Sequence, residues 1–95
     1  MPAYIIVEIE VLDPVGYEEY KKLASASVEK YGGKYIVRGG KTEVLEGKAR
    51  ARNVIIEFPS MEEALACYNS PEYTAARAIR QTVSQGEFVL VEGIE

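Results

Sequence analysis

The stretch Asn53–Ser60, NVIIEFPS, constrains the fold most because it joins a strand pattern to a helix start. Alternating positions from Val54 to Phe58 are apolar and would share one face of a strand, whereas Glu57 would point to the other face. The proline after the strand cannot donate to a sheet ladder, and the serine that follows it forms a capping box with Glu63. We therefore predict a strand that is followed directly by a helix.

The same signals divide the rest of the chain into elements. Alternating apolar residues predict strands, polar caps precede prolines at helix starts, and paired glycines end helices or open loops. The predicted elements are strands over Tyr4–Leu12, Lys34–Arg38, Asn53–Phe58 and Glu87–Glu92, a helix from Asp13 and Pro14 to Gly32 and Gly33, an irregular hairpin over residues 41–52, and a helical region from Met61 to about Ser84 that bends at Ser70 and Pro71.

The order strand, helix, strand, strand, helix, strand is that of an α+β, ferredoxin-like fold. This fold has a four-stranded antiparallel sheet with both helices on one face. We expect a single domain over residues 1–95, since no repeat, low-complexity segment or linker suggests a second one.

The composition excludes several classes of chemistry. The chain has one cysteine and no histidine, so it cannot supply an internal disulfide, a histidine-activated nucleophile, or a histidine ligand for zinc or haem. We expect no metal and no cofactor. A net charge of −4 without a dense basic cluster argues against nucleic-acid binding, and no apolar run is long enough for a membrane span. The first residues do not resemble a signal peptide, and we expect a cytoplasmic location.

The second face of the predicted sheet is too apolar to lie in water. It carries Glu8, Arg38 and Glu57 among the apolar or aromatic residues Tyr4, Ile6, Ile36, Ile55, Val89 and Val91. Large exposed apolar patches usually mark an interface. We predict that two copies pair through this face as a homodimer, and that Arg38 forms an ion pair with Glu57 or Glu8 inside it.

Four motifs are distinctive: YGGKYIVRGG at residues 31–40, RNVIIEFPS at 52–60, YNSPEYTAARAIR at 68–80 and VLVEG at 89–93. In this order they resemble the family known as domain of unknown function 1330, and the resemblance covers essentially the whole chain. It implies a dimeric α/β barrel of ferredoxin-like protomers whose molecular function is not established. Wider relatives include cofactor-independent monooxygenases, lactone isomerases and haem-handling enzymes, so the fold narrows the chemistry little.

Arg38 and Glu57 are the first candidates for a functional site. Arg38 corresponds to the arginine of the RGG motif and could anchor a small acidic ligand through a bidentate contact. Glu57 could be a general base whose pKa is raised by apolar surroundings. The alternative for both residues is a structural ion pair.

A second candidate cluster lies at the predicted bend. Tyr73, Arg77 and Arg80 are spaced by four and three residues and share one helix face. Together with Ser70 at the helix start, they could form an anion pocket. The alternative makes Ser70 only a cap, Tyr73 a core residue, and the arginines partners of surface carboxylates. On the first helix, the Tyr17 hydroxyl could orient a ligand, although a tyrosine stripe at helical spacing is typical of a core.

Other residues are assigned structural or solvated positions. Cys67 has no neighbouring base or cation in the local sequence, which predicts a packing residue rather than a reactive thiolate. Lys21 is placed on the wet side of the first helix. The residues assigned to a solvated loop are Lys41, Lys48, Arg50 and Arg52.

Two functions are carried forward, beside the option of a pure assembly module. The first is binding of a small, possibly acidic, organic molecule in a cleft between sheet and helices. Its candidate contacts are Tyr17, Arg38, Glu57, Ser70, Tyr73, Arg77 and Arg80. The second is a cofactor-independent enzyme of monooxygenase or isomerase type, in which Glu57 abstracts a proton and Arg38 steadies the resulting enolate.

Overall fold

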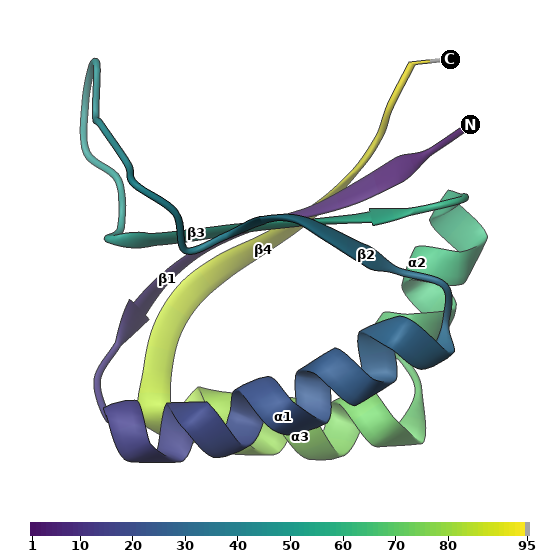
Figure 1. The fold of residues 1–95 in the computed structure, drawn as a ribbon, viewed down its shortest axis with the longest axis horizontal. Coiled ribbons are helices and arrows are strands. Elements are labelled where there is room, and N and C mark those ends of the chain that lie inside the picture. Colours follow the sequence, from purple (N-terminus) through teal and green to yellow (C-terminus); the bar gives the residue numbers. More distant parts are fainter. Residues whose placement is uncertain (95) are drawn as a thin grey trace.

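Four strands and three helices form two layers in the structure, a computed structural model that describes residues 1–94 (Figure 1). In chain order they are β1 (Ala3–Val11), α1 (Pro14–Lys30), β2 (Lys34–Arg38), β3 (Arg52–Phe58), α2 (Met61–Tyr68), α3 (Pro71–Val83) and β4 (Ser84–Glu92). The strands lie in the order β2, β3, β1, β4, and all neighbours are antiparallel. α1 and α3 lie side by side beneath one face of the sheet. The predicted ferredoxin-like fold is confirmed.

Each helix begins at the cap that the sequence indicates. The Asp13 carboxylate accepts hydrogen bonds from the first turn of α1, with its Oδ1 3.1 Å from the Val15 nitrogen. The Ser60 hydroxyl accepts from the Glu63 nitrogen at 3.2 Å and starts α2. Ser70 caps α3 immediately before Pro71, so the predicted helical region divides into two helices at this bend.

The core lies between the helices and the face of the sheet that carries Val7, Ile56 and Phe58. Phe58 is fully buried, and Gly33 lies against it because a Cβ at Gly33 would come within 2.7 Å of the Phe58 ring. Tyrosines from the helices complete this core. The tyrosine stripe of α1 therefore packs on the sheet, as its helical spacing indicates.

The last strand begins earlier than expected. β4 starts at Ser84 rather than Glu87, because Ser84 pairs with Val11 directly at the end of α3. Gly86 therefore lies inside the strand, where a Cβ would contact Ile9 of the neighbouring strand. Phe88 and Leu90 face the helices as predicted.

The face of the sheet away from the helices is open and apolar. Its exposed fractions include 38% for Ile6, 48% for Ile36 and 44% for Val91. The connection between β2 and β3 rises on this side of the sheet without regular secondary structure, and Leu45 within it is 88% exposed (Figure 1). Pairing of two copies through this open face stays a prediction. Within residues 1–94, every helix is too short or too polar to cross a lipid bilayer.

Candidate functional site

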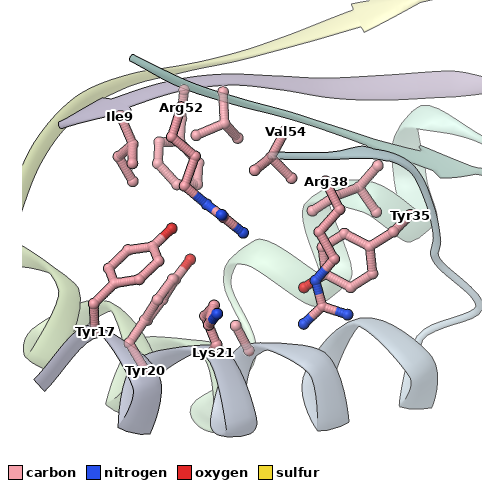
Figure 2. A pocket seen from close by; sticks show the side chains of 12 residues that line it. Ile9, Tyr17, Tyr20, Lys21, Tyr35, Arg38, Arg52 and Val54 are labelled. Atoms are coloured by element: carbon pink, nitrogen blue, oxygen red, sulfur yellow. The ribbon is translucent and has the colours of Figure 1, made fainter. Parts of the chain in front are cut away.

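A small cavity lies between α1 and the sheet, with a volume of about 30 Å³ (Figure 2). Its floor is aliphatic and comes from the sheet, whereas its polar groups come from α1, β2 and the start of β3. The polar or aromatic residues that line it are Tyr17, Tyr20, Lys21, Tyr35, Arg38, Arg52 and Phe88. Among residues 1–94, no carboxylate lines this cavity.

Arg52 projects from the start of β3 into the space between the sheet and α1 (Figure 2). Its Cζ lies 5.6 Å from the centre of the Tyr17 ring, and its Nε is buried without a hydrogen-bond partner in the described chain. Gly39 backs the guanidinium closely, since a Cβ there would lie 2.9 Å from Arg52 Cζ. A buried donor without a partner is costly, and a ligand that accepts its hydrogen bond would relieve the cost.

Arg38 also lies on the helix side of the sheet, which corrects the predicted ion pair with Glu57 or Glu8. A bulge between Tyr35 and Val37 shifts the register, so that Arg38 pairs with Val54 and shares its face. Its Nη2 donates to Ser25 Oγ at 2.7 Å. Its Cζ lies 4.3 Å from the centre of the Tyr35 ring. The extra residue at the bulge reverses the face that simple alternation assigns.

Glu57 and Glu8 remain on the open face and find other partners. The Tyr4 hydroxyl donates to Glu57 Oε2 at 3.3 Å, and burial together with this carboxylate raises the pKa of Tyr4. Glu8 Oε1 accepts from the Arg50 nitrogen at 3.0 Å. Because Arg38 and Glu57 lie on opposite faces of the sheet, they cannot act on one substrate within a single chain.

The cavity combines positive charge with neutral hydroxyl groups. Lys21 lies at its edge and forms an ion pair with Glu18, with Nζ 2.8 Å from Oε1, and this hydrogen bond lowers the pKa of Glu18. Burial raises the pKa of Tyr20 and of Tyr35, so both hydroxyls keep their protons at neutral pH. Two guanidinium groups, an ammonium group and phenol hydroxyls are the donors that an organic acid requires.

The second predicted cluster is divided by the fold. Ser70 uses its hydroxyl within the chain, accepting from the Tyr73 nitrogen at 3.0 Å and donating to the Cys67 carbonyl at 2.6 Å. Tyr73 is buried, and its hydroxyl accepts a hydrogen bond from Arg80 Nη1 at 2.9 Å. Arg77 stays nearer the surface, with its Cζ 4.8 Å from the centre of the Tyr68 ring.

Arg80 and Arg77 therefore lie in different environments. Arg80 is only 9% exposed, with its Cζ 3.9 Å from the centre of the Phe88 ring. The Arg77 guanidinium beside Tyr68 lowers the pKa of that phenol. The cap and core interpretation therefore describes Ser70 and Tyr73, whereas neither arginine forms an ion pair with a carboxylate in the described chain.

Sequence reasoning missed two of the cavity's cations. Arg52 was assigned to a solvated loop because the strand was expected to begin at Asn53, yet extending the alternation by one residue places it on the face of Val54. Lys21 follows Tyr17 by four residues, a spacing that puts both on one side of α1. Cys67 is buried as expected, and burial raises the pKa of its thiol.

The family model described as Domain of unknown function (DUF1330) matches residues 2–94. The chain belongs to this family. No curated protein matches the sequence, and the description of the family assigns no activity to it. Within residues 1–94, no three His, Cys, Asp or Glu side chains gather in a way that could hold a metal ion.

Solved structures share the fold of this DUF1330 chain at low sequence identity. A protein of unknown function from Rhodopseudomonas palustris has a TM-score of 0.80 and 18% identity, over 99% of this chain and 83% of its own. SnoaB, a cofactor-independent oxygenase from Streptomyces nogalater, has a TM-score of 0.69 and 12% identity, over 99% and 94%. A dimeric protein of unknown function with a ferredoxin-like fold from Bacteroides fragilis has a TM-score of 0.64 and 16% identity, over 97% and 96%. At these identities the likeness establishes the fold alone.

Proposed function

We propose that this protein binds a small organic acid, with the acid group in the cavity between α1 and the sheet. The observation that carries the proposal is the guanidinium of Arg52, which projects into that cavity with a buried Nε that has no partner in the described chain. A buried N–H donor without a partner is unfavourable, whereas a carboxylate can accept two parallel hydrogen bonds from a guanidinium. A carboxylate ligand would therefore satisfy Arg52.

The surroundings of Arg52 support an anion rather than a neutral ligand. Lys21 and Arg38 place two further cations at the cavity, and no carboxylate among residues 1–94 lines it. Positive charges that converge on one hollow raise the local concentration of anions and favour their entry. Tyr17 adds a phenol next to the guanidinium, as shown in Figure 2.

The enzyme alternative is weaker in the form based on Glu57 and Arg38, because these residues lie on opposite faces of the sheet. Apart from Lys21, which is paired with Glu18, the side chains in the cavity that can exchange a proton are tyrosines, and burial raises the pKa of Tyr20 and Tyr35. A raised pKa makes a phenol a poorer base at neutral pH. Binding is therefore the function that we favour.

We also propose that the protein is a homodimer that pairs through the open face of the sheet. This proposal is supported by the exposed apolar side chains of Ile6, Ile36 and Val91 on that face. Monomeric proteins rarely leave such patches in water. The neighbour from Bacteroides fragilis is described as dimeric, which supports a dimeric state for this chain as well.

Titration with butanoate, followed by two-dimensional NMR of the backbone amides and of Arg52 Nε, tests the binding proposal. We expect shifts at the cavity in the wild type and at least a tenfold loss of affinity in Arg52→Gln. Arg50→Gln is the matched control, because Arg50 pairs with Glu87 outside the cavity. Wild-type protein that shows no shift at millimolar butanoate, or equal losses in both variants, would overturn the proposal.

A further inference from the structure

The cavity at Arg52 is too small for a whole organic acid. Its volume of about 30 Å³ is close to the space of one water molecule. A carboxylate group can enter it, but the remaining atoms of the ligand must lie elsewhere. The position of those atoms decides which acids the protein can bind.

A larger apolar hollow shares one lining residue with the cavity. It is a groove between α2 and β4 with a volume of about 220 Å³. The groove is lined by Ile5, Ala64, Leu65, Tyr68, Phe88, Val89 and Leu90. We call this hollow the α2–β4 groove.

Among the described residues, Phe88 is the one residue that lines both the cavity and the α2–β4 groove. It also lines a third void of about 10 Å³ next to Tyr73 and Ile56. The side chain is only partly buried and belongs to an edge strand. Arg80 holds one side of the ring through the contact at 3.9 Å described above.

We propose that the natural ligand is an amphipathic monocarboxylic acid whose carboxylate lies at Arg52 and whose apolar body passes Phe88 into the α2–β4 groove. Phe88 is then a movable partition that sets the accepted length of the ligand. This inference rests on the proposed acid-binding function and adds the chemical class of the ligand to it.

The alternative path for the ligand body leads outward past Lys21 and Arg38. That mouth is charged, and Glu18 lies beside it through its ion pair with Lys21. An apolar body there would remain in contact with water and charges. The α2–β4 groove instead offers apolar walls, and Leu65, which lines it, is 46% exposed without a ligand. Covering such a side chain favours binding through the hydrophobic effect.

A series of straight-chain acids measures where the apolar body lies. Acetate, butanoate, hexanoate and octanoate are titrated by calorimetry into the wild type. If each added methylene group enters the groove, the affinity rises by about fourfold per methylene until the groove is filled. Phe88→Ala removes the partition, so we expect hexanoate to gain more affinity over acetate in this variant than in the wild type.

In Leu65→Trp, a larger side chain fills the groove. Because Leu65 is exposed, this substitution should leave the packing of the core unchanged. We expect it to abolish the increase of affinity with chain length and to leave acetate binding unchanged. Leu23→Trp is the matched control, because Leu23 is 42% exposed on α1 and lies outside both hollows. The Leu23→Trp variant should show the same rise of affinity with chain length as the wild type.

The outcomes separate this inference from the proposed function. If affinity does not rise with chain length in the wild type, or if Leu65→Trp keeps the rise, the groove does not hold the ligand and the inference is wrong. Acid binding that still depends on Arg52 would then leave the proposed function standing. If Arg52→Gln instead binds the acids with the affinity of the wild type and with the same dependence on chain length, both the inference and the proposed function are wrong.

Discussion

The hydroxyl groups of Tyr20 and Tyr73 lie 2.8 Å apart in the buried contact between α1 and α3. Because Arg80 also donates to the Tyr73 hydroxyl, this single oxygen connects a buried guanidinium to a tyrosine of the cavity wall. The chain of contacts ties α3 to the candidate site. Its members come from positions 20, 73 and 80, which only the packed helices bring together.

Tyr73→Phe should destabilise the protein more than Tyr20→Phe. Removing the Tyr73 hydroxyl leaves two buried groups without their partner, those of Tyr20 and Arg80, whereas Tyr20→Phe leaves the bond from Arg80 intact. Each unsatisfied buried group costs about 1–3 kcal/mol. Urea unfolding of both variants measures the difference. A larger loss of unfolding free energy in Tyr20→Phe would contradict this order.

Gly33→Ala should destabilise the fold by about 1–3 kcal/mol, the usual cost of an added methyl in a packed core. The new Cβ would lie 2.7 Å from both Phe58 and Val28, which are buried and cannot move freely. Gly40→Ala is the control, since a Cβ there meets no atom within 4 Å. Thermal and urea unfolding compare the two. Equal stability of both variants would show that the core around Phe58 is looser than described.

The ion pair between Lys30 and Glu72 should make the stability of the fold depend on pH in the acidic range. The hydrogen bond from Lys30 lowers the pKa of Glu72 to about 2, well below the ordinary value of 4.5. A carboxylate whose pKa is lowered by folding stabilises the folded state above its unfolded pKa, and this contribution is lost as the pH falls through the folded pKa. The wild type should therefore lose its advantage over Glu72→Gln between about pH 4.5 and pH 2.

Melting temperatures of wild type and Glu72→Gln across that range test the linkage. The pair is exposed to solvent, so added salt should reduce the difference. Glu62→Gln, at an exposed position in the first turn of α2, is the matched control and should not reproduce the effect. A difference in melting temperature between wild type and Glu72→Gln that stays constant from neutral to acid pH would contradict this role of the ion pair.

Ile6→Lys should weaken the proposed homodimer, because it places a charge in the middle of the open face. Val15→Lys is the control, since Val15 is 83% exposed on α1, on the other side of the molecule. Light scattering after size exclusion should give about twice the chain mass of 10.5 kDa for wild type and Val15→Lys. A wild type that stays monomeric at micromolar concentration would refute the pairing.

The fold was predictable because its signals are local. Asp13, Ser60 and Ser70 each cap the helix that follows them, and their function as caps depends on the next few residues alone. Alternation likewise assigned Val54 and Phe58 to the buried face of β3. The start of β4 was missed because Ser84 is recruited by pairing with Val11, a contact far away in sequence.

The site was only partly predictable. Tyr17 was recognised from its place on α1, and Arg38 from its motif, but the bulge after Tyr35 reversed the face assigned to Arg38. A bulge depends on how two strands align, and one strand alone gives no sign of it. Arg52 was missed because the beginning of β3 lies in a charged segment that resembles a loop.

The sequence by itself therefore determined the element order, the helix caps and the two faces of β1 and β3, since these depend on neighbours along the chain. Only the tertiary structure decided that Arg38 and Arg52 meet beneath the sheet while Glu57 stays above it. Strand register and the approach of α1 to the sheet fix which side chains share a cavity. These are long-range contacts, and the local pattern of residues does not specify them.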